Sequence, residues 1–193
     1  MQLTRDDLLS LEQYSAERNA MRQQVMAHKK NRRLAIGEHL SLYFEDKLTM
    51  QYQIQEVLRA ERIFEAAEIN QELDAYNPLI PDGSNWKVTL MVEYKDPLER
   101  ASALSKLIGI ERQTWLQVNG FDKVYAIANE DLERETEEKT SAVHFLRYEL
   151  SPEMIAAAKQ GAAINAGVEH ENYSHSLLPI PANIRDSIVQ DFE

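Results

Sequence analysis

Apolar side chains recur every three or four positions in two long stretches of the chain, which is the spacing of one helical face. The first stripe contains Leu11, Tyr14, Met21 and Val25, and the second contains Met50, Ile54, Val57 and Phe64. They predict helices over about 4–30 and 49–76. Thr4 and Asp7 have the spacing of a capping box at the start of the first helix, and Asn77-Pro78 ends the second.

The pattern changes to alternation after residue 84, and from Trp86 to Tyr94 large apolar side chains occupy every second position, as in a strand with one buried face. Further strands are expected over 40–44, 115–118, 124–127, 143–150 and 173–178, and shorter helices over 97–107, 152–166 and 184–192. Asn119-Gly120 favours a hairpin turn, which breaks any strict alternation of helix and strand. We therefore predict one α+β domain over residues 1–193, in which the long N-terminal helices cover an antiparallel sheet of about five strands, and the sheet-containing part spans about 85–178.

Composition narrows the classes of function. The 193 residues include 32 acids, 21 Lys or Arg and no cysteine, with a net charge of −11. The lack of cysteine excludes a disulfide scaffold, a thiol nucleophile and an iron–sulfur cluster held by this chain alone, and the surplus of acids disfavours binding to nucleic acids or anionic membranes. No apolar run approaches the roughly 18 residues that span a bilayer, so we expect a soluble, cytoplasmic protein.

Two charged residues interrupt the apolar stripes. Arg18 lies between Tyr14 and Met21, and Glu61 lies between Val57 and Phe64. A buried unpaired charge is costly, so the first interpretation is that the helices pack side by side and Arg18 forms an ion pair with Glu61 or its neighbour Glu65. The second is an anion or carboxylate pocket with Arg18, Arg59 and Arg62 as donors. The third is that both charged groups reach solvent. In the first two cases Arg18→Ala should lower the melting temperature by several degrees.

The histidines offer weak candidates for chemistry. His144 alternates with Leu146 and Tyr148 and is predicted to be a hydrogen-bonded core residue. His170 and His175 bracket several polar residues in the segment GVEHENYSH. They could hold one divalent metal, but the segment is also typical of a polar surface loop, and we expect no metal and no cofactor. His170 together with Tyr173 could instead line a small-molecule cleft.

One cationic cluster ends the first predicted helix and contains His28, Lys29, Lys30, Arg32 and Arg33. Such a cluster can bind phosphates or an acidic protein, or it can simply complement the negative end of the helix dipole. An acidic segment over 130–139 (EDLERETEEK) carries the opposite charge and is expected to be a solvated helix or connector. No phosphate-binding loop, nucleophile elbow, dinucleotide fingerprint or His-Glu-x-x-His motif occurs. The catalytic residues are thus unknown, and the motifs favour a protein that is not an enzyme.

Several stretches resemble a bacterial family that carries only a domain-of-unknown-function label. They are LTRDDLLSLEQY, HKKNRR, QIQEVLRAERI, ELDAYNPLIP, FLRYELSPEM and GVEHENYSH, and together they extend over nearly the whole chain. The resemblance implies a gene neighbourhood with rubrerythrin and with an iron–sulfur oxidoreductase. It therefore implies a cytoplasmic role in redox or peroxide handling, with those two proteins as the expected partners.

Three functions follow from these patterns. The first is a non-catalytic accessory or docking protein of a redox-stress system. The second is a small enzyme or ligand-binding protein with a polar cleft formed by Arg18, Arg59, Glu61, His170 and Tyr173. The third is a nucleic-acid-binding regulator that acts through Lys29, Lys30, Arg32 and Arg33, which the net charge makes the weakest of the three.

Overall fold

The computed structural model describes residues 2–131, 134, 136 and 138–193. Nine strands form two antiparallel sheets in this part of the chain. The first sheet has the order β1 (Arg33–Ile36), β2 (Leu40–Phe44), β3 (Asn85–Val92), β7 (Val143–Glu149) and β6 (Ile127–Ala128). The second has the order β5 (Val124–Tyr125), β4 (Thr114–Val118), β8 (Ile164–His170) and β9 (Tyr173–Leu177).

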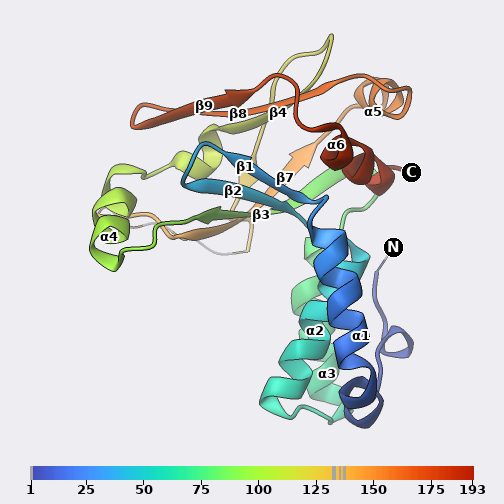
Figure 1. The fold of residues 1–193 in the computed structure, drawn as a ribbon. Coiled ribbons are helices and arrows are strands. Elements are labelled where there is room, and N and C mark those ends of the chain that lie inside the picture. The colour runs from blue at the N-terminus through green and yellow to red at the C-terminus, as the bar shows by residue number, and fades with distance from the viewer. Residues whose placement is uncertain (1, 132–133, 135, 137) are drawn as a thin grey trace.

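The two sheets lie face to face, as Figure 1 shows, and enclose the main hydrophobic core. The alternation along β3 turns Val88 and Leu90 inward, where they share one cluster with Leu116 and Ile164 of the second sheet. A buried hydrogen bond also joins the layers, because the Tyr148 hydroxyl of β7 donates to Oγ1 of Thr114 in β4 at 2.8 Å. Apolar burial between the sheets therefore holds the sandwich together.

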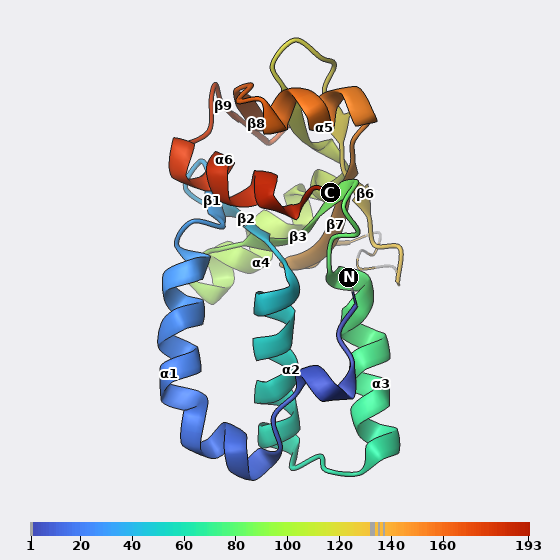
Figure 2. The ribbon, with the colours of Figure 1, turned by 90° about the vertical axis from the view of Figure 1, so that its right-hand side faces the viewer.

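Three helices stand side by side and extend from one end of this sandwich (Figures 1 and 2). They are α1 (Leu11–Lys29), α2 (Lys47–Glu61) and α3 (Ala66–Tyr76). Together with the N-terminal segment 2–10, which crosses them, they form what we call the helical arm. The arm has its own small core, which contains Leu3, Met50, Ile54, Leu58, Leu73 and Ile80. The arm is thus a second packing unit within one domain.

Shorter helices complete the fold. They are α4 (Pro97–Lys106), α5 (Pro152–Lys159) and α6 (Ala182–Ile188). The last of these leads to the C-terminal segment, where Phe192 packs on the ring of Trp86 with 4.7 Å between centroids. Within the described residues, no helix is long and apolar enough to cross a membrane.

The α+β class and the five-stranded antiparallel sheet confirm the fold prediction. Two details of the arrangement differ from the expectation. We expected the long helices to lie on the sheet, but the second sheet covers it and the helices project away (Figure 2). The predicted hairpin over 115–118 and 124–127 is divided, since β5 pairs with β4 whereas β6 pairs with β7 of the other sheet. The acidic segment 130–139 includes positions 132, 133, 135 and 137, which lie outside the described residues.

The two long helices begin and end at other residues than predicted. The predicted capping box of Thr4 and Asp7 is present, with the Thr4 N–H donating to the Asp7 carboxylate at 2.8 Å, but it begins only a short 3-10 helix, Arg5–Asp7. The long helix begins later, where the Ser10 hydroxyl accepts a hydrogen bond from the Gln13 backbone N–H at 3.2 Å. The predicted helix 49–76 is interrupted at Arg62, which has the left-handed conformation (φ 58°, ψ 40°) and ends α2. The chain reverses there, so α3 packs beside α2 instead of continuing it.

Candidate functional site

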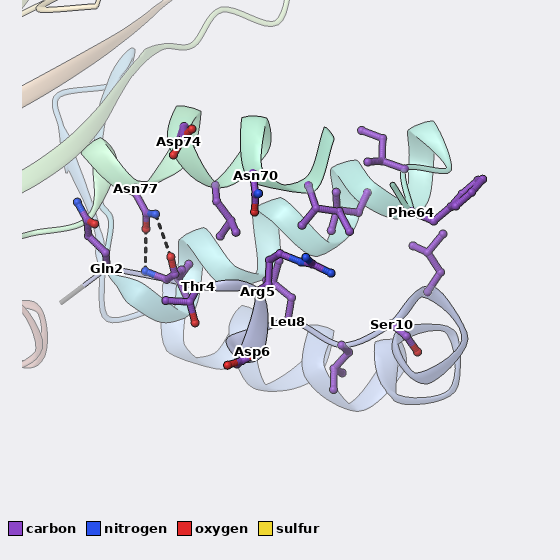
Figure 3. A pocket seen from close by; sticks show the side chains of 17 residues that line it. Gln2, Thr4, Arg5, Asp6, Leu8, Ser10, Phe64, Asn70, Asp74 and Asn77 are labelled. Atoms are coloured by element: carbon purple, nitrogen blue, oxygen red, sulfur yellow. Dashed lines mark hydrogen bonds between the residues drawn. The ribbon is translucent and has the colours of Figure 1, made fainter. Parts of the chain in front are cut away.

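A groove of about 970 Å³ lies in the helical arm, between the N-terminal segment and the pair of helices α2 and α3. Figure 3 shows its lining from close by. Its apolar lining includes Leu3, Leu8, Leu58, Ile63, Ile69 and Leu73. Polar side chains at its edges include Arg5, Asp6, Asn70 and Asp74. We call this feature the arm groove; its volume is in the range of protein binding sites.

Carboxamide side chains fix the N-terminal wall of the arm groove. Asn77 holds both backbone groups of Leu3, with distances of 2.7 Å to its N–H and 3.0 Å to its carbonyl. Gln55 holds Leu9 in the same way, at 2.6 Å and 3.3 Å. The side-chain amides of Asn77 and Gln55 bond only to backbone groups of the N-terminal segment. The side chains of this segment can therefore line the groove. These hydrogen bonds therefore hold the N-terminal wall of the groove in place.

Phe64 stands at the mouth of the groove with 71% of its surface exposed. The sequence placed it in the buried stripe of a continuous helix, and that expectation is wrong. The left-handed residue Arg62 ends α2 two positions earlier, so the periodicity no longer applies at Phe64. A large exposed aromatic beside a concavity is typical of a surface that binds a partner.

The helix side of the groove is acidic. Residues 61–76 contain five carboxylates and one guanidinium, a net charge of −4. Four of these acids are exposed: Glu61, Glu65, Glu68 and Asp74. None of the four forms an ion pair within the described part of the chain. Of these four, Asp74 lines the groove. The other three give this helix side a net negative charge, next to the exposed Arg59 and Arg62.

Arg18 does not lie in a pocket with Glu61. Its guanidinium forms a two-point contact with Glu56 of α2, at 2.7 Å and 2.8 Å, and the Tyr14 hydroxyl donates to the same carboxylate at 2.6 Å. The expected packing of two helices through an Arg18 ion pair is present, but the partner is neither Glu61 nor Glu65. These hydrogen bonds, above all the one from Arg18, lower the pKa of Glu56 to about 2. Burial, together with the hydrogen bond to Glu56, raises the pKa of Tyr14.

The contact between Arg18 and Glu56 allows a more specific prediction of how Arg18→Ala changes the melting temperature. Arg18→Ala leaves Glu56 with only the Tyr14 hydroxyl, so we expect the melting temperature to fall by a few degrees while the groove keeps its shape. Thermal unfolding followed by circular dichroism measures this effect. An unchanged melting temperature would show that solvent replaces the contact at no cost.

The other residues of the predicted cleft lie apart from one another. Arg59, Glu61 and Arg62 are exposed at the end of α2, whereas His170 and Tyr173 belong to β8 and β9 of the second sheet. The arm and this sheet occupy different parts of the molecule in both views (Figures 1 and 2). The structure therefore does not bring the two groups into one cleft.

His170 and Tyr173 are engaged within the fold. His170 Nε2 lies 3.1 Å from the carbonyl of Ile108, and its Nδ1 accepts from the Asn172 N–H at 3.1 Å. The Tyr173 hydroxyl donates to the Ile36 carbonyl at 2.6 Å, and the ring of His175 packs against Tyr173. Within the described residues, no cluster of three or more His, Asp or Glu side chains has the arrangement of a metal site.

His144 is fully buried, as predicted for a core residue.

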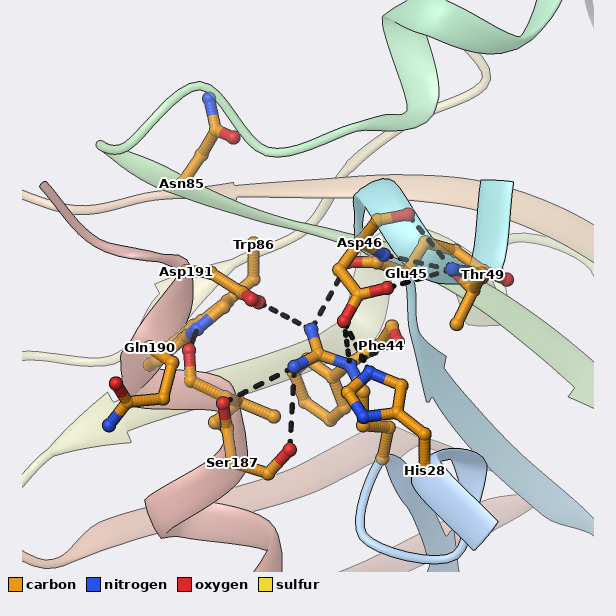
Figure 4. A network of polar contacts seen from close by, with 12 residues as sticks. His28, Phe44, Glu45, Asp46, Thr49, Asn85, Trp86, Ser187, Gln190 and Asp191 are labelled. Atoms are coloured by element: carbon orange, nitrogen blue, oxygen red, sulfur yellow. Dashed lines mark hydrogen bonds and ion pairs between the residues drawn. The ribbon is translucent and has the colours of Figure 1, made fainter. Parts of the chain in front are cut away.

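The cationic cluster is divided between the interior and the surface. Arg32 is only 2% exposed, and Figure 4 shows it at the centre of a polar network. Its guanidinium donates to the carbonyl oxygens of Phe44 (2.9 Å), Glu45 (3.2 Å) and Ser187 (3.2 Å). It also lies 2.6 Å from Asp191 and 3.4 Å from Asp46. This residue therefore joins the base of the arm to the C-terminal segment and is not available to a phosphate.

Other members of the cluster are also paired. His28 lies 2.5 Å from Asp46, and Arg33 lies 3.1 Å from Glu93 on the outer face of the first sheet. Lys29 and Lys30 are at the end of α1.

Burial of the Asp191 carboxyl raises its pKa to about 6, because the effect of burial is larger than the lowering of the pKa by Arg32. The sequence did not predict this polar network, because the network depends on Asp191, which is 159 positions from Arg32.

Comparison with known proteins gives a family and a structural neighbour. Residues 2–192 match the family described as "Protein of unknown function (DUF3501)". The chain belongs to this family. DUF3501 membership agrees with the resemblance seen in the sequence. The fold is similar to a crystal structure of a protein of unknown function from Burkholderia pseudomallei, with 49% identity, 100% of both chains covered and a TM-score of 0.95. No curated protein matches the chain.

Proposed function

We propose that this DUF3501 protein is a non-catalytic docking component of a cytoplasmic redox or peroxide-stress system, and that it binds its partner protein in the arm groove. The observation that carries this proposal is the groove itself: a concavity lined by both apolar and polar side chains, with the exposed ring of Phe64 at its mouth. Surfaces of this kind are uncommon on monomeric proteins unless they bind something.

The alternatives receive less support. A small-molecule cleft would need Arg18 and His170 together, but these side chains bond to Glu56 and to the Ile108 carbonyl in different parts of the fold. A nucleic-acid interface would need a continuous basic surface, but Arg32 is buried and Arg33 contacts Glu93. A docking role needs neither arrangement.

The partners we propose are rubrerythrin and an iron–sulfur oxidoreductase, which the family resemblance in the sequence implies. A chain without cysteine holds no iron–sulfur cluster alone, so its part in such a system would be to bring redox proteins together or to hold one of them. The electron-transfer groups would then belong to the partner.

The test is direct binding between purified proteins. Rubrerythrin and the iron–sulfur oxidoreductase encoded in the same genome are titrated against the immobilised chain, and the dissociation constant is measured by biolayer interferometry. Phe64→Ala should weaken binding at least tenfold, since removal of a central aromatic anchor from an interface costs about 2 kcal/mol or more. The matched control is Leu98→Ala, because Leu98 on α4 is 82% exposed but lies outside the arm.

Two results would contradict the proposal. If neither purified protein binds the wild-type chain at concentrations up to 100-fold above those in cells, the redox docking role fails. If a partner binds and Leu98→Ala weakens the complex more than Phe64→Ala does, the docking surface lies on α4 and not in the arm groove.

A further inference from the structure

We infer that the arm groove accepts a cationic amphipathic helix, about three turns long, presented by the partner. This inference rests on the proposed docking function and adds the chemistry of the segment that is bound. Three observations carry it: the hydrogen-bonding state of the groove walls, their length and their charge.

The backbone of the groove walls has no open strand edge. The N-terminal segment uses its N–H groups internally: those of Leu3, Thr4, Asp7, Leu8 and Leu9 all have acceptors. On the carbonyl side, Leu3, Asp7 and Leu9 accept from the side chains of Asn77, Gln51 and Gln55. The opposite walls are helices, whose backbone groups bond within the helix. An extended peptide would find few partners for its own backbone here, whereas a helix brings its hydrogen bonds with it.

The length of the groove sets the length of the occupant. Its α3 wall has 11 residues, which corresponds to roughly 16 Å at 1.5 Å per residue. A helix of about three turns spans this distance and presents apolar side chains at positions i, i+3, i+4 and i+7 along one face. Those side chains would contact the partly exposed lining residues Leu8, Ile63 and Ile69, and Phe64 would close over one end.

The charges at the groove select a basic occupant. Asp6 and Asp74 stand at opposite edges, on the N-terminal segment and on α3 (Figure 3). Glu65 lies beside Phe64, and the stretch 61–76 has a net charge of −4. Arg5 is the cation that lines the groove among the described residues. Lys or Arg side chains that flank the apolar face of a bound helix would therefore meet carboxylates on both sides.

The test uses three labelled 14-residue peptides and fluorescence anisotropy. The first places leucines on one helical face and lysines on the other, the second replaces every lysine by glutamate, and the third is a scrambled sequence of the first composition without an apolar face. We expect the lysine peptide to bind at least tenfold more tightly than either control peptide at 50 mM salt, and more weakly at 500 mM salt.

Variants locate the bound peptide. Phe64→Ala should weaken the lysine peptide about tenfold through loss of apolar contact, and the double variant D6K/D74K should weaken it by a similar factor while improving the glutamate peptide. Glu38→Lys is the control for charge reversal at a single site, because Glu38 is exposed and lies outside the arm, between β1 and β2. It should leave the binding unchanged.

The outcomes separate this inference from the docking function. Equal binding of the scrambled and amphipathic lysine peptides would overturn the inference, since general attraction to an acidic protein would explain it. Failure of all three peptides, with purified partner proteins still bound in a Phe64-dependent way, would also overturn it and leave the docking function intact. Selective binding of the lysine peptide without binding of either redox protein would support the inference and reject those two partners.

Discussion

Replacement of Arg32 by alanine should lower the free energy of unfolding by about 3–5 kcal/mol, because the change removes one member of a buried ion pair and leaves the other behind. The carboxylate of Asp191, 2.6 Å from the guanidinium, would remain in the interior without its cation. Three backbone carbonyls would lose a donor at the same time. Urea unfolding at pH 7, followed by circular dichroism, measures the loss.

The neighbouring arginine provides the control. Arg33 also has a carboxylate partner, Glu93, but its side chain is 50% exposed, so Arg33→Ala should cost less than about 1 kcal/mol. Similar losses in the two variants would mean that water reaches the Arg32 network and that burial does not decide its energy.

A second substitution identifies the cause of the loss. If the charge left on Asp191 dominates, then Asp191→Asn should recover part of the stability in the Arg32→Ala background, although it removes a favourable partner in the wild-type background. A double-mutant cycle measures this coupling. An additive result would place the cost in the lost carbonyl contacts instead.

The contrast between buried Arg32 and exposed Arg33 also shows what could not be predicted from the sequence. They are adjacent in one basic cluster, and the sequence pattern predicts the same exposed, cationic role for both. The strand β1 begins at Arg33, so successive side chains point to opposite sides of the chain. Two of the acceptors that hold Arg32 belong to Ser187 and Asp191 near the C-terminus, and no local pattern predicts a contact over such a separation in the chain.

The elements with a strong local pattern were predicted well. The alternation from Trp86 to Tyr94 corresponds to β3, and the stripe from Leu11 to Val25 lies within α1. Their grouping into two sheets was not predictable, because the face-to-face packing of β4 and β8 on the first sheet depends on contacts between distant segments. Local periodicity predicts which residues are buried and leaves the choice of packing partner open.

The arm groove illustrates the same point at the candidate site. The stretch ERIFE over 61–65 contains no glycine or proline, so nothing in it signals the left-handed turn at Arg62 that exposes Phe64. The N-terminal wall of the groove depends on Asn77 and Gln55, whose side-chain amides bond to backbone groups of Leu3 and Leu9. Such contacts place no demand on side-chain type in the N-terminal segment, and they leave no complementary pattern in the sequence.

The second large effect concerns pH, and it follows from the raised pKa of Asp191. The pKa is about 6 in the folded protein against 3.8 for an unperturbed aspartate, a difference worth roughly 3 kcal/mol. The folded state binds this proton more tightly than the unfolded state does. The contribution of Asp191 to stability is therefore most favourable below pH 4, and it is lost as the pH rises from about 4 to 6.

Asp191→Asn isolates this contribution, since asparagine does not titrate. The quantity to measure is the difference in the free energy of unfolding between wild type and variant, by urea titration at several values between pH 4 and pH 7. Whatever its absolute value, this difference should shift in favour of the variant by up to about 3 kcal/mol over that range. A difference that stays constant with pH would show that Asp191 has an ordinary pKa and that Arg32 fully compensates its burial.

Glu56→Gln should give the opposite slope and serves as the internal control. Arg18 and Tyr14 lower the pKa of Glu56 from 4.5 to about 2, so this carboxylate stabilises the folded state above pH 4.5 and the benefit is lost as the pH falls toward 2. The wild type should thus gain on the Glu56→Gln variant as the pH rises from 3 to 5, while it loses against Asp191→Asn between 4 and 6. Opposite slopes from two ion-paired carboxylates would follow from their surroundings: burial dominates at Asp191, and hydrogen bonding dominates at the partly exposed Glu56.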